Sequence, residues 1–468
     1  MNDDRLGHAV VIGGSMAGIL TARVLSDRFD QVTIIERDRL PDGPEVRKGV
    51  PQTRHLHAFW AGGMEVVERL LPGVGNDLIA AGAVPLGLPT EMAWLTPSGR
   101  WSQAFPASQR IVSSTRALLE WTVRSHVEKL TNLRFFTEHE VTGLNVRPPG
   151  ELAGLRLRDR RSGATAELPA DLVVDASGRG SRLPEWLEDA GFAAPEESTI
   201  DSFLGYATRM FEIPAGFSAR WNAVYLQPAP PVHSRGGIMF PIEGNRWVLT
   251  LIGGGGDYPP TDEQGFRDFA ASLRSSLLSE VIEVAEPASP IWGYRRTSNR
   301  RRHYEKLAMP GRLLVIGDSL CAFNPSYGQG MTVAAKEAEL LTGILEDCRS
   351  SADLPRALEG AQAVIATRVK GSWMLATGSD LRYPTTVGAT QTRMDKVVNK
   401  YLDRVLAAVP VDPTVSAAFL RVLNLIDEPQ ALFSPRLMPR VLRTRRRLPA
   451  VPKDFVVDRE LSSTERRP

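Results

Sequence analysis

The sequence predicts an α/β protein: a parallel sheet flanked by helices, interrupted by an antiparallel β domain and followed by a helical C-terminal region. Three observations predict it. β-branched runs end in glycine-rich turns at residues 8–18, 171–180 and 313–318, and the first turn leads into a helical pattern. Residues 195–300 hold many aromatic residues in short β-like runs. After Leu345, prolines separate a series of helical stretches.

The composition indicates a globular protein with a small ligand. The chain has 468 residues, and its 43% hydrophobic content is enough for a sizeable core. A net charge of +2 creates no field that would attract a nucleic acid. Gly, Arg or Asp interrupts every apolar run before the ~18 residues that a membrane span needs. Only two cysteines, Cys321 and Cys348, and an N-terminus without a secretory signal favour a reducing cytoplasm.

The first forty residues predict a dinucleotide-binding βαβ unit. The strand 8–12 ends in Gly13, which makes the tight turn, and Gly18 lets the next helix pack against the strand. Ser15 stands where a glycine is usual, so we expect a slightly wider approach of the backbone to the pyrophosphate. Glu36 follows Gly18 by 18 residues, near the spacing of a ribose-binding carboxylate. The expected cofactor contacts are Gly13, Ser15, Met16, Ala17, Gly18, Glu36 and Arg37.

Residues 312–335 (RLLVIGDSLCAFNPSYGQGMTVAA) run from an apolar strand through a Gly-Asp pair and a proline-containing, glycine-rich loop into a helix. This stretch resembles the flavoprotein monooxygenases of the para-hydroxybenzoate hydroxylase type. The resemblance implies a Rossmann-like FAD-binding domain, whose Gly-Asp pair closes on the ribityl chain and whose Pro and Gly turn wraps the flavin ring. A carboxylate at a strand end is a suitable partner for a sugar hydroxyl. The residues implied are Gly317, Asp318, Pro325, Gly328, Gly330 and Met331.

The middle glycine turn bears on the source of electrons. Residues 171–182 (DLVVDASGRGSR) resemble the family's Asp-Gly motif, which lies near the pyrophosphate and is tied to NADPH use. By this resemblance Asp175 belongs to the cofactor site, but Ser177 stands where the aspartate of the pair is expected. We therefore expect electrons from NADPH or NADH, delivered directly or through a separate flavin reductase.

Four stretches carry a closer resemblance: residues 47–57 (RKGVPQTRHLH), 206–209 (YATR), 317–331 and 373–384 (WMLATGSDLRYP). They are similar to a narrower bacterial group that includes the flavin-dependent epoxidases of polyether biosynthesis. This resemblance implies that Arg54, His55 and His57 lie in a loop along FAD; a plain surface loop is the alternative. The wider family often directs a side chain at the position of Arg116 toward the pyrophosphate, and a solvated arginine is the alternative there.

The resemblance implies oxygenation of a hydrophobic small molecule. Reduced FAD and O2 give a C4a-hydroperoxide, whose distal oxygen passes to an electron-rich alkene. Because this step needs no side-chain acid or base, no catalytic side chain is assigned, and we expect an apolar pocket with few titratable groups. The expected substrate is an alkene of polyketide or terpenoid origin in secondary metabolism such as antibiotic biosynthesis. The alternatives are hydroxylation of an aromatic polyketide, halogenation, prenyl reduction, and flavin-based sensing without turnover.

These motifs divide the chain into three regions. The FAD-binding domain takes residues 1–70, 105–190 and 305–350, the substrate-binding β-sheet domain takes 71–104 and 191–304, and a helical cap and tail take 351–468. Large side chains of the second region are candidate pocket walls, although each alone is more often ordinary core. They are Phe203, Tyr206, Met210, Phe211, Trp221, Tyr225, Met239, Phe240, Trp247 and Trp292.

Two further expectations concern metals and partners. No CxxC, HExxH or EF-hand pattern occurs, so no metal site is expected. The basic run 436–447 suits an acidic carrier protein or a membrane surface, with a solvated helix face or a loose tail as the alternative.

Overall fold

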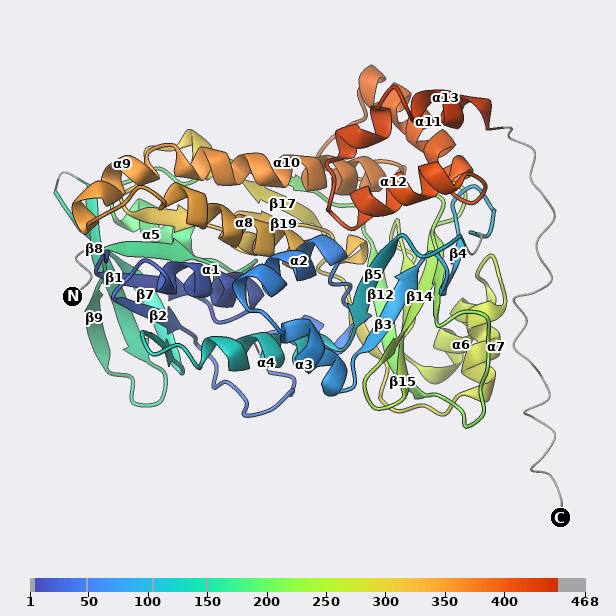
Figure 1. The fold of residues 1–468 in the computed structure, drawn as a ribbon, viewed down its shortest axis with the longest axis horizontal. Coiled ribbons are helices and arrows are strands. Elements are labelled where there is room, and N and C mark those ends of the chain that lie inside the picture. The colour runs from blue at the N-terminus through green and yellow to red at the C-terminus, as the bar shows by residue number, and fades with distance from the viewer. Residues whose placement is uncertain (1–4, 48, 103–104, 149, 445–468) are drawn as a thin grey trace, which may run out of the picture.

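The computed structural model describes residues 5–47, 49–102, 105–148 and 150–444. A five-stranded parallel sheet in the order β18–β10–β1–β2–β6 forms the core of one half of the molecule. This half lies at the left of Figure 1. Four of the sheet's strands are short, apolar and almost wholly buried, as is usual for parallel sheets, whereas the edge strand β6 is partly exposed. The strands are β1 (His8–Ile12), β2 (Gln31–Ile35), β6 (Leu133–Phe136), β10 (Leu172–Asp175) and β18 (Leu313–Val315).

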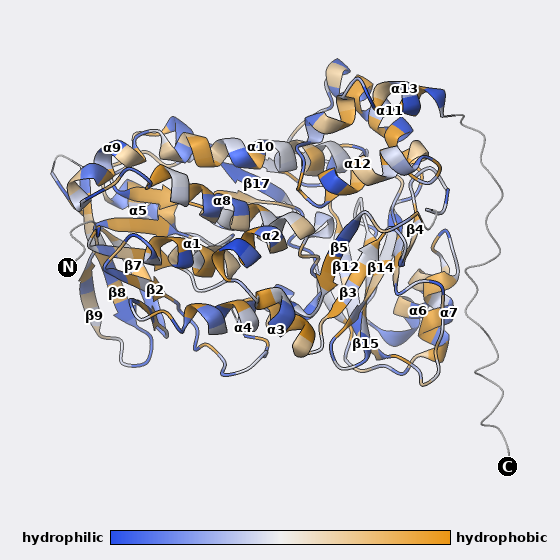
Figure 2. Ribbon diagram, in the orientation of Figure 1, coloured by the Kyte–Doolittle hydropathy of each residue, from blue (hydrophilic) through white to orange (hydrophobic). Residues whose placement is uncertain are grey.

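Helices cover one face of the parallel sheet and a second sheet covers the other. α1 packs on β1 and β2 and against α8, while the antiparallel sheet β7–β8–β9 contacts β2 and β10. Figure 2 shows apolar residues in the strands between these layers. The elements are α1 (Met16–Ser26), α2 (Ala61–Leu70), α3 (Val74–Ala80), α4 (Arg116–Val127), α5 (Leu183–Asp189), α8 (Gly330–Ile344), β7 (His139–Arg147), β8 (Glu151–Asp159) and β9 (Thr165–Pro169).

A six-stranded sheet in the order β16–β12–β15–β14–β13–β4 forms the second half of the molecule (Figure 1). Its pairs are antiparallel except β13 with β4. Two smaller sheets, β3–β5 and β11–β17–β19, complete the β structure described. The strands are β3 (Val84–Leu88), β4 (Met92–Leu95), β5 (Gln109–Ser113), β11 (Glu197–Ile200), β12 (Gly205–Glu212), β13 (Ala223–Leu226), β14 (Arg235–Ile242), β15 (Arg246–Gly253), β16 (Trp292–Tyr294), β17 (Asn299–Arg302) and β19 (Cys321–Ala322).

The two faces of the six-stranded sheet belong to different cores. Successive strand residues point to opposite faces, so Trp94 and Phe240 join the main core while their neighbours pack under α6 (Glu263–Ala271) and α7 (Leu277–Val284). Because of this alternation, the prediction that the large side chains of this region line one pocket is wrong for part of the set. Four of the candidates pack in the second core under α6 and α7: Phe211, Trp221, Met239 and Trp247.

The C-terminal region is helical, as the sequence predicts, and lies across the junction of the two halves (Figure 1). Among the described residues no single helix is long and apolar enough to cross a membrane; α11 and α12 pass that test only as a pair, bent by 120°. Residues 445–447 of the basic run lie outside the described residues. The helices are α9 (Leu354–Leu358), α10 (Ala361–Asp380), α11 (Arg393–Ala408), α12 (Pro413–Leu423) and α13 (Met438–Arg443).

Candidate functional site

The first glycine turn has the geometry of a phosphate-binding loop. Gly13 has a φ of 105°, which favours glycine, and its N–H donates to the Ile35 carbonyl at 2.8 Å. A Cβ at Gly18 would lie 1.8 Å from the Gly13 carbonyl oxygen, so only glycine allows α1 to come this close to β1. The helix begins at Met16, and no side chain in the described part of the protein caps its first N–H groups. These N–H groups are therefore available to an anion.

The third glycine turn meets the first in space. Gly317 has a φ of 60°, and a Cβ placed there would lie 2.9 Å from the Cβ of Ala17. Its N–H donates to Oε2 of Glu337 on α8 at 2.6 Å. Asp318, the next residue, is partly exposed, and within the described structure its carboxylate accepts no hydrogen bond, so it is free to bind a sugar hydroxyl. Burial raises the pKa of Asp318, while Arg179 and other arginines oppose this.

Glu36 is buried and already engaged by the protein. It accepts the N–H groups of Gly14 and Asp38, each at 2.9 Å, and lies 2.8 Å from Arg47. Arg47 also lies 2.8 Å from Glu120 of α4, and despite the cost of burial the two carboxylates raise the pKa of Arg47. The expected ribose carboxylate thus belongs to a largely buried Glu–Arg–Glu network, in which Glu120 was not predicted. Its signal in the sequence is its i, i+4 spacing from Arg116 on one helix.

Ser15, Arg116 and His57 come together beside this network. The Ser15 hydroxyl donates to Glu120 at 2.5 Å and accepts from Arg116 Nη2 at 2.9 Å. The other Arg116 nitrogen lies 3.4 Å from His57 Nε2, and His57 Nδ1 lies 2.9 Å from the His55 carbonyl. Burial and Arg116 lower the pKa of His57 to about 3, so the ring is neutral, with its proton on Nδ1. Serine at position 15 therefore links α1 to α4.

Two other predicted residues lie differently. The Asp175 carboxylate is completely buried and accepts bonds from the hydroxyls of Ser177, Ser181 and Ser319. It therefore braces the second glycine turn from inside the protein. The Arg54 guanidinium lies over the Trp292 ring, 5.7 Å from its centroid, on the side of the six-stranded sheet.

The loop 324–328 begins the approach to α8. Asn324 accepts the Ser326 N–H, Pro325–Tyr327 form a 3₁₀ turn, and Gly328 is left-handed with a φ of 65°. A Cβ at Gly328 would lie 3.0 Å from Ala58, so the loop closes on the segment that precedes α2. α8 then begins at Gly330, and Met331 packs in the core.

His55 connects the motif 47–57 to the six-stranded sheet. Its Nδ1 lies 2.8 Å from the Thr208 hydroxyl, which lies 2.7 Å from that of Thr250. The rings of Tyr206 and Tyr294 pack on His55 at centroid distances of 4.8 and 5.7 Å. Burial lowers the pKa of His55 to about 4 and raises the pKa of both phenols, so the whole group is uncharged at neutral pH.

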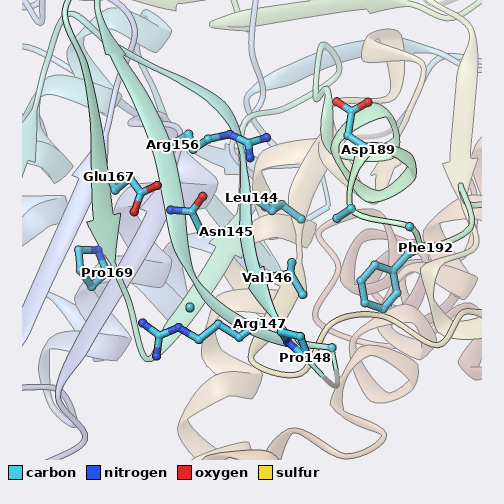
Figure 3. A pocket seen from close by; sticks show the side chains of 14 residues that line it. Leu144, Asn145, Val146, Arg147, Pro148, Arg156, Glu167, Pro169, Asp189 and Phe192 are labelled. Atoms are coloured by element: carbon cyan, nitrogen blue, oxygen red, sulfur yellow. The ribbon is translucent and has the colours of Figure 1, made fainter.

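Two surface hollows lie outside this group. One of about 620 Å³ is lined by Arg37, Arg47 and Arg160 among others, and thus opens beside Glu36. The other, of about 790 Å³, lies between the sheet β7–β8–β9 and the segment after α5, where Figure 3 shows Arg147, Arg156, Glu167 and Phe192. None of the predicted site residues lines this second hollow.

A Rossmann-like sheet with three glycine turns, joined to a second sheet with a neutral face, defines the class of the protein: it is an FAD-dependent monooxygenase. Residues 8–353 match the family described as FAD binding domain, and the chain belongs to that family.

Relatives and solved structures agree with this family. Protein Rv3254 of Mycobacterium tuberculosis is 33% identical over 431 residues, 90% of each chain. Kynurenine 3-monooxygenase of Dictyostelium discoideum is 22% identical, covering 72% of this chain and 69% of its own. The crystal structure of PqsL, a probable FAD-dependent monooxygenase from Pseudomonas aeruginosa, superimposes with a TM-score of 0.59 at 17% identity, covering 80% of this chain and 97% of its own.

Proposed function

We propose that this enzyme epoxidises an uncharged, hydrophobic alkene, of the kind found in polyketide and terpenoid intermediates. The observation that carries the proposal is the neutral centre of the sheet face turned toward the FAD-binding half. The side chains that alternate onto this face are Trp94, Tyr206, Thr208, Tyr225, Ile238 and Thr250. None of these six side chains is charged, and Arg54 lies at the edge strand, over Trp292. A charged group placed directly against the six would lose water without gaining an ionic partner from them, which costs several kcal/mol or more.

The same groups favour an alkene over a phenol. Bound and reduced, FAD supplies an electrophilic oxygen atom derived from O2. Oxygenation of a phenol gains from a base whose pKa lies near the working pH, whereas the pKa of His55, which lies in this group, is lowered to about 4. An alkene needs no deprotonation. The side chains of this sheet face therefore need only orient the substrate and exclude water.

The glycine turns supply the cofactor contacts of the proposal. The start of α1 at Met16 would hold the pyrophosphate, Asp318 the ribityl chain, and the loop from Pro325 to Gly328 the flavin ring. Electrons come from NADPH or NADH, directly or through a separate flavin reductase. Ser177 stands at the position of the usual aspartate, and both its N–H and its hydroxyl donate to Asp175. Because the aspartate tied to NADPH use is thus replaced by an internally bonded serine, we favour the separate reductase.

Aromatic hydroxylation is the second candidate, because relatives from Dictyostelium discoideum and Xanthomonas campestris carry the name kynurenine 3-monooxygenase. The test supplies the FAD-loaded enzyme with NADPH or NADH, a flavin reductase and ¹⁸O2, and compares a lipophilic alkene with a phenol of similar size. Epoxidation consumes two electrons and two protons, places one ¹⁸O in the epoxide and releases the other as water. Labelled product from the phenol alone would favour hydroxylation, and oxidation of reduced flavin without any labelled product would overturn both.

A further inference from the structure

Asp380 is a completely buried carboxylate at the end of α10, within the stretch WMLATGSDLRYP. Its Oδ2 accepts from Asn299 Nδ2 at 2.6 Å, and its Oδ1 accepts from the Tyr327 hydroxyl at 2.6 Å. Asn324 Nδ2 donates to both oxygens, at 3.1 and 3.2 Å. Three side chains from β17 and from the loop 324–328 therefore converge on one carboxylate.

The two oxygens of this carboxyl group receive four hydrogen bonds, a pattern that favours its ionised form. A carboxylate only accepts hydrogen bonds, whereas a carboxylic acid must also donate one. Oδ1 of Asn299 already accepts the N–H of Asn324, and Oδ1 of Asn324 already accepts from Ser326. Burial raises the pKa of Asp380, and the hydrogen bonds from Tyr327 and Asn324 oppose that rise.

The network joins three distant parts of the chain at the loop 324–328. Asn324 starts the 3₁₀ turn and Tyr327 ends it, so both ends of the turn are tied to Asp380. The indole of Trp60 adds a bond to the Tyr327 carbonyl at 3.4 Å. Because a buried charge and its donors form a unit, loss of one member disturbs the others.

We propose that Asp380 is a positioning residue for FAD, which fixes the loop 324–328 through Asn324 and Tyr327 and places a compensated negative charge behind it. The inference rests on the proposed placement of the flavin ring against this loop. Reduced flavin carries more negative charge than oxidised flavin, so a nearby carboxylate lowers the reduction potential of the bound cofactor.

The experiment measures the FAD dissociation constant, the visible spectrum and the reduction potential of bound FAD by equilibration with a redox dye. Asp380→Asn removes the charge, and Tyr327→Phe removes one donor while leaving the charge. The matched control is Asp403→Asn, the same chemical change at a 55% exposed side chain paired with Arg382. Asp380→Asn replaces an accepting oxygen by an NH2 donor, so the loop 324–328 loses a hydrogen bond to a charged group and is held less firmly. We therefore expect about tenfold weaker FAD binding for this variant, and no change for the control.

The sign of the shift in reduction potential distinguishes an effect of the Asp380 charge from a general loss of structure. Asp380→Asn is expected to shift the potential of bound FAD to a more positive value. Tyr327→Phe is expected to shift the potential to a more negative value. This variant removes a hydrogen-bond donor that partly compensates the negative charge of Asp380, so the charge acts more strongly on the flavin. Shifts in the same direction, or none, would overturn the proposal.

Two further outcomes are distinguishable. If Asp380→Asn does not fold, Tyr327→Phe alone decides, and an unchanged potential refutes the role. Opposite shifts in an enzyme that oxygenates neither alkene nor phenol would support this inference and refute the proposed function, since the potential requires only bound FAD.

Discussion

The contribution of Glu337 to the stability of the protein is expected to fall as the pH rises through neutrality. This side chain is completely buried; its Oε2 accepts the Gly317 N–H, and its Oε1 has no partner within the described structure. Burial raises the pKa of Glu337 from 4.5 to about 8. The folded protein thus holds this proton more tightly than the unfolded chain, so the contribution of this group to stability is complete below pH 4.5 and declines up to about pH 8.

At about 1.4 kcal/mol for each tenfold change in proton affinity, the decline reaches about 4 kcal/mol between pH 5 and pH 8. Glu337→Gln removes the titration and keeps an acceptor for Gly317. Urea unfolding of the FAD-free protein across that range is expected to show that the unfolding free energy of the variant increases relative to that of the wild type as the pH rises. Glu339→Gln, two residues along the same helix and partly exposed, serves as the control. A difference between variant and wild type that stays constant with pH would refute the reasoning.

Two further predictions concern the cofactor-binding half. In Gly18→Ala the new Cβ would overlap the Gly13 carbonyl, so the variant is expected to lose about 1–3 kcal/mol of unfolding free energy and to bind FAD more weakly. Its control is Gly343→Ala on α8, where the Cβ would meet open space, and this variant is expected to gain about 0.5–1 kcal/mol of unfolding free energy. FAD titration and chemical unfolding of both variants check this, and equal effects would contradict it. Arg47→Met leaves two carboxylates without their cation and is expected to cost about 3–5 kcal/mol in unfolding free energy, whereas Arg69→Met, from an exposed pair, is expected to cost about 1 kcal/mol or less; similar losses would contradict the burial argument.

The sequence was sufficient for those parts of the fold that depend on neighbours in the chain. The strand, turn and helix around Gly13 follow one another directly, and the structure confirms them as β1 and α1. The start of α8 at Gly330 and the helices after Leu345 are confirmed for the same reason. Local propensity and glycine geometry decide these elements before any tertiary contact forms.

The remaining site residues act through contacts that no local pattern encodes. Glu120, Glu337 and Asp380 are polar positions in helical runs, and only tertiary packing shows that each contacts a backbone N–H or a distant side chain. Glu337 and Asp380 are completely buried, and Glu120 is partly buried. The pocket wall was overestimated because aromatic content alone does not say which face of a strand a residue occupies; Phe211 and Tyr206 lie on the same strand and face opposite cores.

The bonds of Asp380 to the loop 324–328 also limit how this enzyme can be divided. The family match ends at residue 353, whereas Asp380 lies beyond it and holds two residues inside it. The region that matches the family is therefore not a self-contained module, since its loop 324–328 is held by a segment outside its own boundary. Chimeras that exchange the C-terminal helices between relatives will therefore also exchange the carboxylate that holds this loop. If the proposed placement of the flavin is right, such chimeras will change its reduction potential.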